Sequence, residues 1–185
     1  MNNALIARTR RRFKPGSPMI ELKKLSEEAV PAALEKAMRY RLLNEPGEAE
    51  SVCHDILCVD PDNQKALVTL LLALTDRFGK GYHVSVTHAR EVVPRLQDAY
   101  ERAYYSGIIR ERQAKAQLQH GHPGSGFEAY EFLREAMTYY EEAEAIRPAG
   151  NDDTVLRWNA CARLIMRDRR LVPAEEERGE PLLLE

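Results

Sequence analysis

The sequence predicts an all-α protein, and three observations support this prediction. Apolar residues recur at spacings of three and four along successive segments of the 185-residue chain, which is the period of an amphipathic helix. These segments end at proline, glycine or asparagine residues, which commonly stop helices. No segment shows the alternation of apolar and polar residues that is typical of a half-buried strand. The chain therefore reads as helices joined by turns, with the length of about one domain.

The first two predicted helices occupy residues 26–43 and 49–60. Ser26 is suited to cap the first helix, and two glutamates follow it in the first turn, where the helix dipole favours acids. The helix should stop before Pro46. The second helix should end near residue 60, because Pro61 disfavours helical geometry in the residue that precedes it.

A third helix is predicted to begin after Asp62 or Asn63, either of which can cap it. Its centre, residues 67–74, is apolar on nearly every side. A helix that is apolar all round is covered on every side, so we expect this one in the middle of a stack. Gly79 and Gly81 should end it.

The second half of the chain continues the pattern of helices and turns. A glycine-rich loop at residues 120–126 separates two long helices, and Asp152 or Asp153 should cap the last helix. Pro94 either ends a helix or kinks one long helix. The predicted helices cover residues 82–93, 96–119, 127–146 and 154–167.

A repeat of about 34 residues accompanies these helices. The second helix of each unit carries a small residue, then a residue in the position of a buried aromatic, then a proline that ends the unit. These residues are Ala49, Cys53 and Pro61 in one unit, and Ala136, Tyr140 and Pro148 in another. Pro94 follows Pro61 by about one repeat length, which marks a unit between them. First-helix positions recur in the same way, at Ala33, Lys36, Ala37 and Tyr40, and then at Leu67, Leu70, Leu71 and Leu74. Over residues 30–165 this pattern resembles the tetratricopeptide repeat (TPR) family.

The chain departs from the TPR pattern in two respects. Ala33 and Leu67 stand where tryptophan is preferred, and Leu71 stands where glycine is preferred. The unit between Pro94 and Pro148 is about 20 residues longer than a 34-residue repeat, so we expect its helices to be elongated.

The resemblance implies a right-handed α-solenoid of about three TPR-like hairpins with a C-terminal capping helix, over residues 26–170. The first helix of each hairpin would line a concave, largely apolar groove, which suits a scaffold or adaptor that binds a peptide or helix of another protein. The groove residues that the family geometry implies are Leu34, Met38, Arg41, Leu42, Lys65, Val68, Leu72 and Thr75.

Segments of opposite charge flank the predicted domain, although the net charge of the whole chain is only −2. Residues 171–185 form an acidic tail, and residues 1–25 form a basic arm that could bind an anionic surface or nucleic acid through phosphate contacts. Both are expected to be flexible. The basic side chains of the arm are Arg8, Arg10, Arg11, Arg12 and Lys14.

Three alternatives to an adaptor follow from the same residues. In size and repeat number the chain resembles a small bacterial secretion chaperone. A nucleic-acid-associated protein would use the basic arm, with the repeats mediating a homodimer. Tyr104 and Tyr105 could stack on a base in that case, although tyrosines at this spacing more often pack inside a protein. An enzyme hidden in the long third hairpin is the least favoured alternative.

No motif predicts a metal, a cofactor or a catalytic centre. On a helix, Cys53 and His54 point about 100° apart, and Cys58 adds no second cluster that would complete four ligands. The histidine pairs 83 and 88, and 120 and 122, are equally incomplete. The loop 121–126 lacks the lysine followed by serine or threonine with which a phosphate-binding loop ends. We therefore predict no cofactor, no metal site and no enzymatic activity.

The cysteine content and the apolar runs favour the cytoplasm. Three cysteines, Cys53, Cys58 and Cys161, form no disulfide framework, so we expect reduced thiols that face the core. No secretory signal is visible. The most apolar stretch, residues 66–74, is far shorter than the ~20 residues that a membrane-spanning helix needs.

Overall fold

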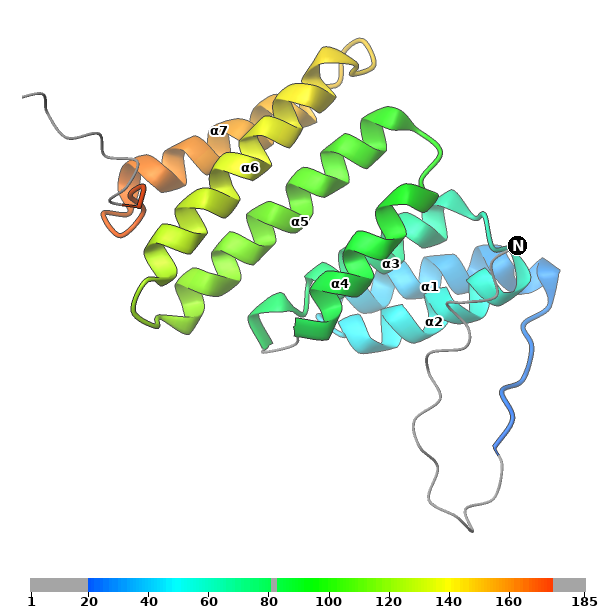
Figure 1. Ribbon diagram of the computed structural model, residues 1–185. Coiled ribbons are helices and arrows are strands. Elements are labelled where there is room, and N and C mark those ends of the chain that lie inside the picture. The colour runs from blue at the N-terminus through cyan, green and yellow to red at the C-terminus, as the bar shows by residue number, and fades with distance from the viewer. Residues whose placement is uncertain (1–19, 81–82, 175–185) are drawn as a thin grey trace, which may run out of the picture.

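A computed structural model describes residues 20–80 and 83–174, and this part of the chain contains seven α-helices and no strand (Figure 1). The all-α prediction is therefore confirmed. Short 3-10 turns lie at Glu27–Ala29, Phe78–Lys80 and Val93–Arg95. The helices are α1 (Val30–Leu42), α2 (Pro46–Val59), α3 (Gln64–Thr75), α4 (His83–Val92), α5 (Ala99–His120), α6 (Ser125–Ala145) and α7 (Asp153–Arg167).

Each helix packs on the next one along the chain. The most extensive packing joins α5 and α6, the two longest helices, which lie side by side in Figure 1. Their length agrees with the expected elongation of the third hairpin. Helix α1 also contacts α3, and α3 contacts α5, so these three alternate helices are neighbours in space.

The helix starts are only partly as the sequence predicts. Asn63 caps α3 as expected, since its side chain accepts a hydrogen bond of 2.9 Å from the backbone N–H of Ala66. Ser26 makes no such bond and precedes a 3-10 turn, so α1 begins later than predicted. At α7, Asp152 also makes no side-chain cap bond, and Asn151 accepts from the N–H of Asp153 instead.

Prolines and glycines end several helices as predicted, whereas α3 already stops at Thr75, before Gly79. Helix α2 stops before Asp60, which has φ −124° and ψ 85° in front of Pro61. Pro94 lies in the 3-10 turn after α4 and is followed by an extended Leu96, so it ends a helix and does not kink one. Gly121 follows α5 with φ 66°, a left-handed conformation that glycine adopts without strain.

The core consists of two apolar clusters. One lies among α1–α4 and one side of α5, and it contains nearly all of the central residues of α3. Most of the apolar third helix is therefore covered as expected, but Val68 and Leu72 are only half-buried. The other cluster lies among α5, α6 and α7. Two half-buried side chains, Leu72 and Tyr105, pack against both clusters and join them.

Small residues allow close approach between helices. Ala49, Ala136 and Ala143 are fully buried. Gly107 lies in the middle of α5, against the ring of Tyr140 on α6, and a Cβ atom there would come within 2.5 Å of that ring. The long α5–α6 pair therefore depends on a glycine at this position.

The first and last described residues can be compared with the predicted basic arm and acidic tail. Residues 20–26 precede the first turn without helix, and Leu25 packs partly against the first cluster. Leu171 is buried in the second cluster. The basic residues 8–14 and the tail residues 175–185 lie outside the described part, so their expected flexibility stays a prediction.

The cysteines and the membrane prediction can also be compared with the structure. Cys53 and Cys161 are buried as expected, but Cys58 is exposed, because it lies on the side of α2 that faces solvent. Within residues 20–80 and 83–174, no helix is both long enough and apolar enough to cross a lipid bilayer.

Candidate partner-binding face

The predicted groove residues occupy different depths in the structure. Leu34 and Thr75 are buried, so they belong to the packing of the helices. Met38 and Leu42 on α1 are exposed by 44% and 88%, and Lys65 at the start of α3 is also exposed. Val68 and Leu72 are half-buried on α3. Arg41, the remaining residue of the set, has a specific partner.

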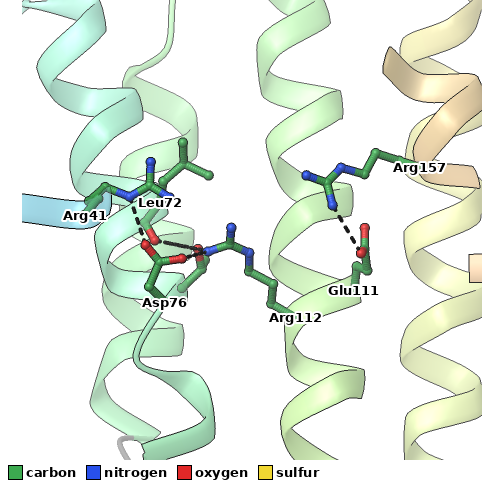
Figure 2. Close-up of polar contacts among 7 residues, drawn as sticks. Arg41, Leu72, Asp76, Glu111, Arg112 and Arg157 are labelled. Carbon is green, nitrogen blue, oxygen red and sulfur yellow. Dashed lines mark hydrogen bonds and ion pairs between the residues drawn. The ribbon is translucent and has the colours of Figure 1, made fainter. Parts of the chain in front are cut away.

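Asp76, at the end of α3, binds arginines from both neighbouring helices (Figure 2). Arg41 on α1 donates from Nε to Asp76 Oδ2 at 2.9 Å. Arg112 on α5 donates from Nη1 to Asp76 Oδ1, and also to Thr75 Oγ1 at 2.7 Å and to the carbonyl oxygen of Leu72 at 3.2 Å. One carboxylate therefore ties α1, α3 and α5 together.

Asp76 and Arg112 are not among the residues that the repeat pattern predicts for the groove, although the spacing of the charged residues carries a signal for them. Arg41 and Asp76 are 35 residues apart, and Asp76 and Arg112 are 36 residues apart. Both spacings are close to one repeat length. Opposite charges at this spacing are the signal from which these contacts could have been predicted.

A second polar cluster joins α5 to α6 and α7. Glu111 is only 1% exposed, yet its carboxylate accepts a hydrogen bond of 2.6 Å from the hydroxyl of Tyr140. Lys115 approaches the same carboxylate at 2.5 Å. Arg157 on α7 approaches it at 3.4 Å, as Figure 2 shows. Every donor in the cluster therefore faces one buried acid.

The charge state of Glu111 follows from these contacts. Burial alone would raise its pKa, but the hydrogen bonds from Lys115 and Tyr140 and the nearby positive charges outweigh it. They hold the pKa of Glu111 below its usual value of 4.5. The acid is therefore ionised at neutral pH, and a buried negative charge links the three C-terminal helices.

The tyrosines of α5 pack mainly against one another. The ring of Tyr104 stacks on Tyr100 at 5.8 Å between centroids and meets the edge of Tyr105 at 5.2 Å. Burial, reinforced by the charge of Glu101 and opposed by that of Arg41, raises the pKa of Tyr105 to about 12. These contacts favour packing over base stacking for Tyr104 and Tyr105.

We call Asp76, its two arginines and residues three, four, seven or eight positions away along the same helices α1, α3 and α5 the arginine face. Its charged groups are the two arginines and the acid that holds them, and its other members are apolar or aromatic. Among the described residues, Arg41 donates only through Nε and Arg112 only through Nη1, so their other guanidinium N–H groups are free to bind a ligand. The face consists of Met38, Arg41, Val68, Leu72, Asp76, Tyr105 and Arg112.

An open pocket of about 280 Å³ borders the arginine face. It lies between the end of α3, the turn at Phe78 and the C-terminal half of α5, and it contains two basic side chains, Arg112 and Lys115. Gln119 lines its outer edge. The pocket extends the arginine face toward the end of α5.

The histidines and cysteines that were considered as metal ligands are dispersed. Burial raises the pKa of the Cys53 thiol to about 12, whereas His54 is exposed and lies 3.9 Å from Glu50. In the part of the chain that the structure describes, no three His, Cys, Asp or Glu side chains are placed to hold a metal ion. The side chains of His83 and His120 lie outside that part.

Comparison with known proteins identifies no relative. No family model, no curated protein and no solved structure matches the chain.

Proposed function

We propose that the chain is a protein–protein interaction scaffold that binds a peptide or helix of another protein on the arginine face. The observation that carries this proposal is the meeting of α1, α3 and α5 at Asp76, with half-buried apolar side chains beside it. A surface built from three elements offers a partner a longer contact than any single helix. Apolar centres rimmed by polar groups are typical of protein interfaces.

A TPR-like solenoid is the architecture that this proposal assumes. In such a solenoid the first helices of successive hairpins, here α1, α3 and α5, lie next to one another along one side. The contacts of α3 with both α1 and α5, and the near-repeat spacing of Arg41, Asp76 and Arg112, support this arrangement. Helix α7 would then cap the stack.

The composition of the arginine face defines the partner that fits it best. Met38, Val68 and Leu72 offer aliphatic contacts, and Tyr105 offers an aromatic one. The unused N–H groups of Arg41 and Arg112 would bind carboxylates, which guanidinium groups recognise well. We infer a partner segment that combines apolar anchors with acidic side chains. The sequence alone had suggested a largely apolar groove.

Two variants of the chain, each used as bait in a capture experiment, test the proposal. Met38→Glu places an acid on the exposed side of α1 within the arginine face, and it should abolish capture of the partner from a lysate of the source cells. Met38 is already exposed, so the melting temperature should change little. The matched control is Leu156→Glu, an exposed leucine on α7, and it should retain the partner.

Two outcomes would contradict this assignment. Equal capture by both variants would show that the partner binds elsewhere. Loss of binding only after replacement of Arg10, Arg11 and Arg12, with an affinity that falls steeply as salt rises, would instead support the nucleic-acid alternative.

A further inference from the structure

The chain leaves the described part beside the C-terminal end of α5. Leu171 is buried in the second cluster, and Arg170 lies with its Nη1 3.5 Å from the carbonyl oxygen of Leu118. The backbone of Arg170 also lies directly against Gly126 at the start of α6. These contacts fix the point from which residues 175–185 extend.

This exit point is close to the basic pocket. Leu118 is within one helical turn of Lys115 and next to Gln119, both of which line the pocket. A segment that starts at Leu118 has only to pass around α5, a helix about 10–12 Å in diameter, to reach it. Eleven extended residues span up to roughly 36–40 Å. Residues 175–185 can therefore reach the pocket and the arginine face beyond it.

The charges of the two surfaces are complementary. The pocket and the arginine face together contain three basic side chains, Arg41, Arg112 and Lys115, and one acid, Asp76. Residues 175–185 contain five glutamates, one arginine and the apolar run Pro-Leu-Leu-Leu. The tail therefore has the acidic and apolar groups that we infer for a partner segment.

We propose that residues 175–185 bind in cis along the pocket and the arginine face. The glutamates at 175–177 lie next to Lys115 and Arg112, and the leucines at 182–184 cover Leu72 and its apolar neighbours. The tail thereby acts as an internal competitor for the surface. This last consequence rests on the proposed partner-binding function, whereas the binding of the tail does not.

A spin label on the tail of the full chain tests the proposal without any partner. Gly179→Cys in a Cys58→Ser background gives one reactive thiol, because Cys53 and Cys161 are buried and burial raises the pKa of each to about 12. The nitroxide should broaden the amide signals of residues 75–79 and 112–119. The signals should return in about 1 M salt, where the Debye length falls to about 3 Å.

Two matched variants locate the contact. Gln119→Glu adds a negative charge at the edge of the pocket and should reduce the broadening, whereas Thr138→Glu adds the same charge to an exposed position on α6 and should not. Broadening centred on Arg163 and Arg167 of α7, or on the basic arm at residues 8–14, would overturn the proposal. So would weak broadening spread evenly over the molecule. A tail that binds as expected in a chain that captures no partner would leave this inference intact and refute the proposed function alone.

Discussion

Gly107 and Tyr140 show how much depends on single residues in this protein. The aromatic ring occupies the space where any other residue at 107 would place its Cβ atom. Tyr140 in turn is fully buried and donates its hydroxyl to Glu111. The sequence shows a glycine inside a predicted helix, which normally weakens it, and only the structure reveals the packing reason.

Replacing this glycine tests the packing directly. Gly107→Ala should destabilise the protein by about 1–3 kcal/mol, because overpacking forces either the ring or the helices to move. The matched control is Gly47→Ala in α2, where no atom lies within 4 Å of the added Cβ. That variant should be neutral or slightly stabilising, since alanine favours helix. Urea denaturation of both variants measures the difference, and equal stabilities would show that α5 and α6 are not packed this closely.

Glu111 makes the stability of the protein depend on pH. Its folded-state pKa is lowered, so its charged form stabilises the fold at neutral pH, and this contribution is lost as the pH falls below about 4.5. The free energy of unfolding should therefore decrease on acidification through this range. Glu111→Gln keeps an acceptor for Tyr140 but cannot titrate, so its stability should fall less over the same range. An identical pH dependence in both proteins would assign the acid sensitivity to other carboxylates.

At the scale of the helices, the sequence predicts the last residue of most helices well, but it predicts the first residue less often. Prolines and glycines act through local geometry, and Pro61, Pro94 and Gly121 each follow or mark the end of a helix. The first residue of a helix depends on which nearby polar side chain accepts a hydrogen bond from a free backbone N–H group of the first turn. Asp98 caps α5 through the N–H of Tyr100, but the buried Leu96 looked like part of the helix, and the start was predicted too early.

The caps of α3 and α7 give a matched pair for testing these starts. Asn63→Ala removes a side chain that binds the N–H of Ala66, and it should cost about 1 kcal/mol of stability. Asp152→Ala removes a residue in the same position of α7 that makes no cap bond, so it should cost much less. Thermal denaturation of the two variants checks this, and a larger loss for Asp152→Ala would reverse the assignment of the caps.

At the scale of the whole molecule, the contacts that join the two clusters are the least predictable from sequence. The apolar run of α3 predicts that most of this helix is buried, because a helix that is apolar on nearly every side has to be covered. It does not show that Leu72 and Tyr105 reach both clusters, or that Asp76 binds arginines from two other helices. These contacts depend on how the helices are placed relative to one another.

The arginine face therefore differs from the groove that the sequence suggests. Leu34 and Thr75 are buried, and Asp76, Tyr105 and Arg112 belong to the face although they were not among the predicted groove residues. Val68 and Leu72 remain on the surface as expected. The periodic pattern was sufficient to find the central helix of the face, but not its partners.

Site-specific photo-crosslinking tests the central claim, that the arginine face receives the partner, most directly. A photoreactive amino acid at Val68 or Met38 would lie on or beside the face, and one at Cys58 or Leu156 would lie on exposed positions away from it. Illumination of the full chain with its captured partner should give covalent adducts from the first two positions and none from the other two. Adducts from Cys58 or Leu156 in the absence of adducts from Val68 and Met38 would place the partner on another surface and contradict the account.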